Sequence, residues 1–296
     1  MKILVSYRAI PASPGWATGD LVVKAFRALG HEVYPYAKYY QQHKWAEDRQ
    51  FNLDDHDWDL ILYLECNDGD PQYHELKIVR TRKMACWLFD TSYYNDRCRS
   101  VVDYFKFDHH FLANPLTVQD YKAWGYSNVH YLPYACDPEL HSRSLEYPKT
   151  RDVVLVGSIR EDRVKLQKEL AKHNIKLELI GGVFREAYID ALASAKIVIN
   201  QNPPEGRGLL NMRFWEATAA GAWIITEKHD LDLNPSIEMA PNNSYESVED
   251  LAQKCHKCLH ESPKPLEWFV PQNEFLREHS YQSRCKKLLE TVFPHG

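Results

Sequence analysis

Short apolar runs alternate with helix-like segments along the first half of the chain. Residues 2–7 have the pattern of a buried strand. Apolar positions then recur at helical spacing over 19–29, and Gly30 follows where a helix C-terminal cap belongs. A strand pattern at 32–34 completes a strand–helix–strand unit, which predicts a parallel sheet. The other elements expected in this half are strands at 60–64, 84–89, 110–113 and 129–132, and a helix at 115–124.

The same order of elements begins again after residue 151. The expected strands are 153–156, 177–180, 197–200 and 223–226, and the expected helices are 161–172, 185–194, 210–220, 247–259 and 281–293. The polar segment 137–151 shows no periodicity, so we interpret it as a linker. We therefore predict one α/β domain at 1–140 and a second at 150–275. The remaining segment, 276–296, is expected to form a helix that packs back toward the first domain.

Composition narrows the class of protein. The chain has 296 residues, 44% of them hydrophobic and 26% charged, as expected for two globular domains. Its formal net charge is −5, so the protein as a whole has no positive electrostatic field that would attract polyanions. Net charge therefore does not indicate nucleic acid as a partner. No apolar run is long enough to span a membrane. Seven cysteines, with no apolar signal-peptide region at the start, predict free thiols and a cytoplasmic location.

The turn after the strand at 153–156 is a candidate anion site. Gly157 and Ser158 follow the strand and lead to a helix N-terminus, where free backbone N–H groups attract anions. Arg160 and Arg163 add positive charge where a diphosphate would lie. Gly181, at the end of the next strand, is expected at the same site. Ordinary solvated arginines in an α/β turn are the alternative interpretation.

A second glycine-containing loop, 205–210, leads into a helix. Asn211, Met212 and Arg213 lie at its start, where backbone amides and a guanidinium group could converge on phosphate. Glu216 lies about one turn further along, and a carboxylate there could accept both hydroxyls of a ribose. An amphipathic helix with a surface glutamate is the plain alternative.

These motifs resemble a known family. The run 210–222, LNMRFWEATAAGA, is similar to the signature of CgeB-like (spore maturation protein type) glycosyltransferases, which are similar to glycosyltransferase family 4. The pieces 154–158 with Arg163, 195–200, and 279–281 with Arg284 resemble the same family. The resemblance covers most of 150–290. Over 1–137 it is thinner and rests on 30–33 and 132–137.

The resemblance implies the GT-B fold, with two Rossmann-like domains facing a central cleft. It implies transfer of a hexosyl or pentosyl group from a nucleotide sugar, UDP- or GDP-linked, to an acceptor hydroxyl. No cofactor or divalent metal is required, and retention of configuration is favoured. Arg163 matches the basic residue that faces the diphosphate, and Glu216 matches the second glutamate of the family 4 pair. The sequence departs from the pattern at the first glutamate, where it has Gly208, and Glu205 is out of register.

The first domain is expected to hold the acceptor, which the sequence leaves open as a glycan, a small molecule or a nucleobase. Should the reaction invert configuration, a base from this domain is needed. Asp90, after a buried strand, is the first candidate, and His109 and His110 are the next. Gly15, Trp16 and Tyr93 are candidates for lining the acceptor site, because aromatic faces stack on sugars and bases.

Other interpretations stay open. Asp68 and Asp70 have the spacing of a metal-binding acidic pair, although turn chemistry explains an Asp-Gly-Asp segment as well. Cys255, His256, Cys258 and His260 suggest zinc, but they lie in a helical pattern without a second pair. At the level of function, a GT-B nucleotide-sugar epimerase and a non-catalytic nucleotide- or glycan-binding module are the alternatives.

Overall fold

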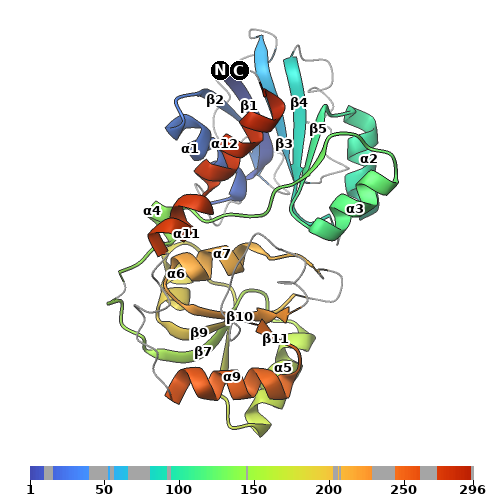
Figure 1. Cartoon of the computed structure of the whole chain (residues 1–296). Coiled ribbons are helices and arrows are strands. Elements are labelled where there is room, and N and C mark those ends of the chain that lie inside the picture. Colours follow the sequence, from blue (N-terminus) through green and yellow to red (C-terminus); the bar gives the residue numbers. More distant parts are fainter. Residues whose placement is uncertain are drawn as a thin grey trace. The chain divides into compact units, whose positions relative to one another are not determined.

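A computed structural model gives the architecture of the chain (Figure 1). The residues that it describes are 1–9, 16–39, 53, 57–65, 81–91, 95–144, 146–202, 206, 208–228, 244–260 and 272–294. The chain forms two compact units. Unit 1 consists of Met1–Pro133 together with Tyr281–Gly296, and unit 2 is the continuous stretch Tyr134–Ser280.

Unit 1 is built on a six-stranded parallel sheet with the order β2-β1-β3-β4-β5-β6. Its strands are β1 (Lys2–Ala9), β2 (Glu32–Tyr39), β3 (Trp58–Leu64), β4 (Thr81–Leu88), β5 (His109–Leu112) and β6 (Val129–Tyr131). Pro35 lies within β2, and this strand is at the edge of the sheet, where a missing N–H is tolerated. Its helices are α1 (Thr18–Ala28), α2 (Asn95–Phe105), α3 (Pro115–Ala123) and α12 (Tyr281–Val292).

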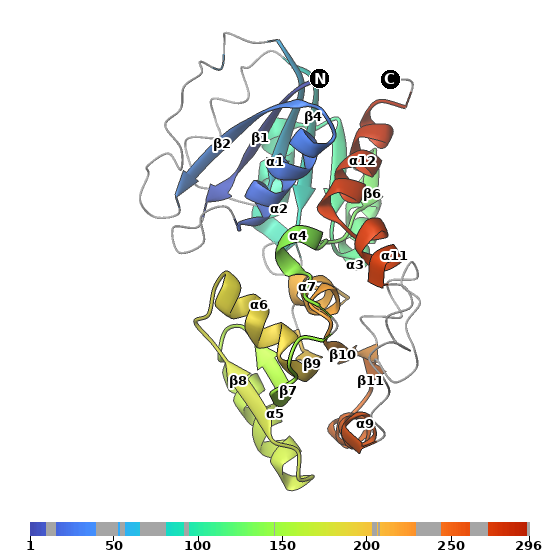
Figure 2. The same ribbon diagram turned by 90° about the vertical axis from the view of Figure 1, so that its left-hand side faces the viewer.

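Helix α12 is part of unit 1 although it is far away in sequence. It lies beside α1 in both ribbon views (Figures 1 and 2), and the thiol of Cys285 contacts the carbonyl of Val22 at 4.0 Å. The ring of Tyr281 lies 6.3 Å from that of the buried Trp87. Unit 1 therefore completes its packing with a segment that follows unit 2 in the chain.

Unit 2 is built on a five-stranded parallel sheet with the order β11-β10-β9-β7-β8. Its strands are β7 (Arg151–Val156), β8 (Leu177–Ile180), β9 (Ala195–Asn200), β10 (Trp223–Glu227) and β11 (Ser244–Tyr245). Its helices are α4 (Pro138–His141), α5 (Glu161–Lys172), α6 (Glu186–Ala193), α7 (Met212–Ala219), α9 (Val248–His260) and α11 (Gln272–Glu278). Val153, Leu155, Ile197 and Ile199 form a buried core with Leu166 and Leu170 of α5.

The predicted fold class, α/β with two parallel sheets, is confirmed. The interpretation of 137–151 as a linker is wrong, because this segment contains α4 and belongs to unit 2. Residues 134–140, which the sequence assigned to the first domain, also belong to unit 2. Helix α2 was not predicted at all. It buries Cys98, Val101 and Val102 along one face, and its remaining positions are mostly polar.

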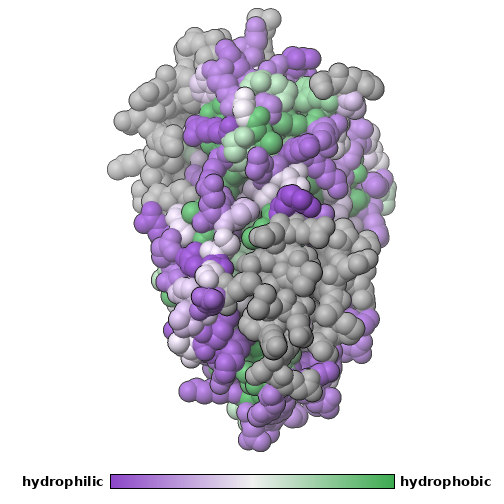
Figure 3. All heavy atoms as spheres, turned by 60° about the vertical axis from the view of Figure 1, so that its left-hand side comes forward, coloured by the Kyte–Doolittle hydropathy of each residue, from purple (hydrophilic) through white to green (hydrophobic). Residues whose placement is uncertain are grey.

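Few large hydrophobic side chains are exposed among the described residues. On the face drawn in Figure 3, hydrophilic residues prevail, and the hydrophobic ones gather mainly toward the top of the picture. The described residues that expose large hydrophobic side chains are Met1, Tyr104, Trp124, Ile159 and Phe184. No helix within the described ranges is both long and apolar enough to cross a membrane.

The expectation that all cysteines are free thiols is wrong for Cys98, which is disulfide-bonded. Sequence alone does not show which cysteines the fold brings together. The cysteines found free among the described residues are Cys86, Cys136, Cys255, Cys258 and Cys285.

Candidate functional site

Two arginine side chains meet at the carboxyl end of β7 in unit 2. Gly157 follows the strand with φ +135°, and its backbone N–H donates to the carbonyl of Ile180 at 2.8 Å. A Cβ atom at Gly157 would lie 2.8 Å from Nη2 of Arg213 and 3.1 Å from Nη1 of Arg163. Both guanidinium groups therefore lie against the bare backbone of this glycine.

Carbonyl and amide oxygen atoms help to hold the two arginines in place. Arg163, in α5, is 3% exposed and donates to the carbonyl of Ser158 at 2.6 Å. Arg213, in α7, is 9% exposed and donates from Nη1 to Oδ1 of Asn200 at 3.0 Å and from Nε to the carbonyl of Val156. Two guanidinium groups directed at one point offer several charged donors to an anion, and such charge-assisted hydrogen bonds are strong.

Asparagine side chains fix the start of α7 and the position of Arg213. Asn211 caps the helix by accepting the N–H of Arg213 at 3.0 Å, and it donates to Oδ1 of Asn202 at 2.6 Å. Asn200, which holds Arg213, in turn donates to the hydroxyl of Thr226 at 3.0 Å. Arg213 is thus anchored from two neighbouring strands and from its own helix cap. Met212 is the first residue of the same helix.

Arg160, which the sequence also placed on the diphosphate, is turned toward its own helix. It forms a two-point ion pair with Asp162, with Nε–Oδ1 at 3.0 Å and Nη2–Oδ2 at 2.8 Å. Hydrogen bonds from Arg160 hold the pKa of the Asp162 carboxyl below its usual value. Arg160 is thus paired with an acidic side chain of its own turn, whereas the side chains found against Gly157 are those of Arg163 and Arg213.

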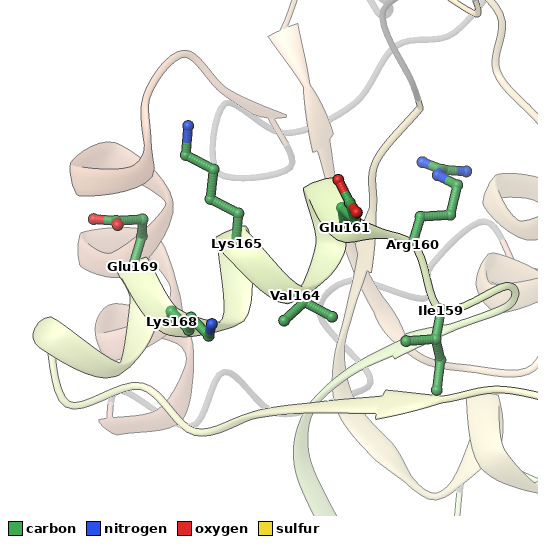
Figure 4. Close-up of a pocket in the computed structure, with 7 residues that line it drawn as sticks. All are labelled: Ile159, Arg160, Glu161, Val164, Lys165, Lys168 and Glu169. Atoms are coloured by element: carbon green, nitrogen blue, oxygen red, sulfur yellow. The ribbon is translucent and has the colours of Figure 1, made fainter.

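An open pocket of about 420 Å³ adjoins this turn (Figure 4). Its lining residues come from the β7–α5 turn and the first turns of α5, and they are Ile159, Arg160, Glu161, Val164, Lys165, Lys168 and Glu169. Gly181 lies on the other side of the turn, where its Cβ would be 2.9 Å from the side chain of Ile159. Neither Arg163 nor Arg213 lines this pocket.

Glu216 is buried in the middle of α7, at 4% exposure. The hydroxyl of Tyr188, in α6, donates to its Oε2 at 2.6 Å, and Nε2 of His141, in α4, lies 3.6 Å from its Oε1. Glu216 therefore belongs to a buried polar cluster and is not a surface residue. Gly208, at the position of the first family glutamate, is buried with φ +84°, and Glu205 lies outside the described residues.

A second candidate site lies at the carboxyl edge of the sheet in unit 1. Leu64 of β3 pairs with Trp87 of β4, so Glu65 and Asp90 both lie just beyond the ends of adjacent strands. Asp90 is exposed, whereas Glu65 is partly buried with φ +68°. Burial and the charge of Asp90 raise the pKa of Glu65 to about 7, and Arg8 opposes this shift. A carboxyl group of this kind can exchange a proton near neutral pH.

His109 and His110 lie elsewhere. They occupy the first two positions of β5, where His109 pairs with Ala85 in the middle of β4, well before Asp90. His109 contacts Nε2 of His130 through Nδ1 at 3.4 Å, and Nδ1 of His110 lies 3.1 Å from the carbonyl of Ser127. Burial lowers the pKa of both His109 and His110. The structure therefore does not bring these histidines to Asp90.

The other predicted residues have simpler outcomes. Trp16 is half-buried just before α1, whereas Gly15, Tyr93, Asp68 and Asp70 lie outside the described residues. In α9, Cys255 is buried, which raises the pKa of its thiol to about 12, and His256 stacks on His260. Within the part of the chain that the structure describes, no three or more His, Cys, Asp or Glu side chains gather in a way that could hold a metal ion.

Four polar residues of these sites were not singled out from the sequence: Glu65, His141, Tyr188 and Asn200. Glu65 and Asn200 could have been found, because each lies at the carboxyl end of a buried strand, where parallel sheets bind ligands. His141 and Tyr188 carried no such signal. They reach Glu216 through contacts across 75 and 28 positions of sequence that only the fold creates.

The raised pKa of Glu65 predicts a pH effect on stability. Its folded-state pKa, about 7, exceeds the unfolded value of 4.5, so its contribution to stability is present below pH 4.5 and is lost as the pH rises to 7. In urea titrations from pH 4.5 to 8, we expect Glu65→Gln to remove this decrease in the free energy of unfolding. Asp90→Asn should shift the midpoint of this decrease to lower pH, because it removes the negative charge that raises the pKa of Glu65. Glu290→Gln, an exposed control in α12, should keep the wild-type profile, and a wild-type profile for Glu65→Gln would contradict the assignment.

Proteins of known structure share the architecture of this chain. No curated protein matches the chain. Solved structures do match, including phage T4 BGT in complex with UDP and Mn²⁺, with a TM-score of 0.61, 13% identity and 99% of each chain covered. HepE of Anabaena in complex with UDP-glucose gives a TM-score of 0.63, with 13% identity and coverage of 99% of this chain and 100% of that one. AviGT4, a glycosyltransferase involved in avilamycin A biosynthesis, gives 0.59, 14% identity and coverage of 98% and 96%.

These likenesses show that the chain has the GT-B type of α/β fold, as the sequence analysis predicted. A family described as glycosyl transferase-like matches residues 141–290, which is half of the chain and includes Arg163, Arg213 and Glu216. The protein belongs to this glycosyl transferase-like family. The narrower resemblance to the CgeB-like group and family 4 stays a prediction.

Proposed function

We propose that the protein transfers a sugar from a UDP- or GDP-sugar to an acceptor hydroxyl without a divalent metal. The observation that carries the proposal is the meeting of Arg163 and Arg213 at Gly157, at the carboxyl end of β7. Two guanidinium groups beside a glycine supply charged donors for a diphosphate, at the edge of the sheet where parallel α/β folds bind ligands. Two of the structures named above, phage T4 BGT and HepE, were solved with UDP and with UDP-glucose, which favours a uridine nucleotide.

In this proposal the arginines act on the leaving group. As the bond between the sugar and the diphosphate breaks, negative charge grows on the departing oxygen, and fixed guanidinium groups stabilise it without reorganising. The N-terminus of α7, capped by Asn211, adds a favourable dipole. Glu216 takes the ribose hydroxyls. In an inverting reaction, Asp90 receives the proton of the acceptor hydroxyl; a retaining reaction is the course that the resemblance favours.

The first test is thermal unfolding with UDP, GDP, ADP, CDP and their common sugars. A nucleotide at 100 times its dissociation constant adds about 2.7 kcal/mol, which for units of this size raises the melting temperature by roughly 5–10 °C. We expect such a shift with UDP or GDP, and we expect it to persist in EDTA. A shift that EDTA abolishes would contradict metal independence, and no shift with any nucleotide would contradict the donor site.

Product analysis separates the three functional classes. Incubation with UDP-glucose and candidate glycans, small molecules and nucleobase-containing acceptors should release UDP and form a new glycoside. An isomerised nucleotide sugar would instead indicate an epimerase, and binding without any product would indicate a binding module. The anomeric ¹H coupling constant of the new glycoside, compared with that of the donor, distinguishes retention from inversion.

A further inference from the structure

The buried carboxylate of Glu216 is held from two sides by side chains of other helices. Tyr188 donates a hydrogen bond of 2.6 Å to Oε2, and Nε2 of His141 faces Oε1 at 3.6 Å. The side chains of His141 and Glu216 are only 3% and 5% exposed. Burying a carboxyl group is costly unless hydrogen-bond partners compensate it, and both neighbours contribute to that compensation.

The backbone determines which way His141 presents its proton. The N–H of Asp137 donates to Nδ1 of His141 at 2.8 Å, so Nδ1 acts as an acceptor and the ring hydrogen is assigned to Nε2. That hydrogen faces Glu216. Asp137 itself is fixed, because its Oδ1 accepts the N–H groups of Glu139 and Leu140 at 2.9 and 3.1 Å. The short helix α4 therefore holds one donor in one orientation toward the carboxylate.

The carboxylate keeps acceptor capacity that these two neighbours do not use. An ionised carboxylate offers about four acceptor positions; Tyr188 occupies one and Nε2 of His141 faces another. Glu216 also lies three residues after Arg213 in α7, so both side chains project from neighbouring positions on one side of that helix. In a nucleoside diphosphate, the ribose next to the diphosphate carries two neighbouring hydroxyl groups. These two donors match the unused acceptor positions of the Glu216 carboxylate.

We propose that His141 and Tyr188 are positioning residues that orient the carboxylate of Glu216 toward the 2′- and 3′-hydroxyls of the nucleotide. This inference rests on the proposed function, because it assumes that a nucleoside diphosphate binds at the arginines. It assigns a binding role to α4, which the sequence presented as a linker. It also predicts that changes at two residues that do not touch the ligand alter how well the protein distinguishes a ribose from its dideoxy form.

The test compares the affinities of UDP and 2′,3′-dideoxy-UDP by calorimetry, using the full chain. The ratio of the two affinities isolates the hydroxyls, because everything else in the ligand is shared. Hydrogen bonds to a charged acceptor favour UDP in the wild-type protein by about 10- to 100-fold. Glu216→Gln should reduce this ratio to below about threefold, while the affinity for dideoxy-UDP stays within about twofold.

Variants of the two positioning residues should lower the ratio of UDP affinity to dideoxy-UDP affinity without changing the affinity for dideoxy-UDP. We expect a decrease of about three- to tenfold for Tyr188→Phe and for His141→Ala. His141→Gln, whose amide can place a donor near the position of Nε2, should restore part of the preference. The matched controls are Tyr147→Phe, which removes a hydrogen bond to Asp190, and His256→Gln, which removes a contact to the carbonyl of His173. Both should keep the wild-type ratio.

Each outcome decides the matter. Equal affinities of wild-type protein for UDP and dideoxy-UDP would overturn the inference and leave the donor site standing. If the Tyr188 and His141 variants lost affinity for UDP and for dideoxy-UDP equally, the inference would also be overturned, because that result indicates that the cluster has a purely structural role. Failure of the wild-type protein to bind UDP or GDP at all would overturn the proposed function and the inference together. Melting temperatures of the variants show whether any loss arises from unfolding.

Discussion

Replacing Arg213 with glutamine is expected to weaken UDP binding by at least about 100-fold. The guanidinium group lies at Gly157, held by Asn200 and the carbonyl of Val156, so it meets a diphosphate already oriented. Charge-assisted hydrogen bonds contribute about 1.5–3 kcal/mol each, and a two-point contact to phosphate loses both at once. Arg163→Gln should give a loss of similar size. Titration calorimetry with UDP at fixed ionic strength measures both.

Arg151→Gln is the matched control for these variants. It removes an arginine at the opposite end of β7, where the side chain pairs with Glu178 on the surface. Its effect on UDP affinity should stay within about twofold, because exposed ion pairs contribute little. Were Arg213→Gln to bind UDP as well as Arg151→Gln does, the carboxyl end of β7 would not be the diphosphate site.

Introducing a side chain at Gly157 is expected to damage the site and the fold together. In Gly157→Ala, the new Cβ would lie 2.8 Å from Arg213 and 3.1 Å from Arg163, so both guanidinium groups must move. The backbone φ of +135° is also unfavourable for an L side chain, at a cost of about 1–3 kcal/mol. We expect a lower melting temperature and a decrease in UDP affinity of about 10- to 100-fold, measured by calorimetry well below the melting temperature.

Gly125→Ala separates strain from steric displacement. Gly125 also has a positive φ, +89°, but a Cβ there meets nothing within 4 Å. This variant should lower stability through backbone strain alone and leave UDP binding unchanged. Wild-type affinity in Gly157→Ala would show that the arginines do not need the space beside this glycine.

The repeating elements of unit 2 could be predicted because its strands contain short, mainly apolar runs, and β7 and β8 are each followed directly by a glycine. Helix α5 and strand β8 have the predicted bounds. The meeting of Arg163 and Arg213 also follows from a general rule, since the carboxyl ends of neighbouring parallel strands share one edge of the sheet. The hydrophobic pattern and the topology of a parallel sheet are therefore sufficient to predict residues that lie near the carboxyl ends of strands.

Other parts of the sites depend on contacts that no local pattern contains. Arg160 and Arg163 look alike in sequence, but Arg160 pairs with Asp162, whereas Arg163 is buried against the carbonyl of Ser158. His109 and His110 belong to a strand that was predicted, but they lie at its start, whereas ligands bind at strand ends. His141 lies in an aperiodic polar segment, and its role depends on the distant Glu216.

The position of α12 bears on the order in which the protein is made. Unit 2 is continuous in the chain, whereas unit 1 needs residues 281–296, and Cys285 and Tyr281 of α12 contact α1 and Trp87. During synthesis, which proceeds from the N-terminus, every residue of unit 2 has therefore left the ribosome before unit 1 can close its last helix–helix contact. Unit 2, which carries the paired arginines, can therefore finish folding first. The face of α1 that packs against α12 stays uncovered until α12 has been synthesised.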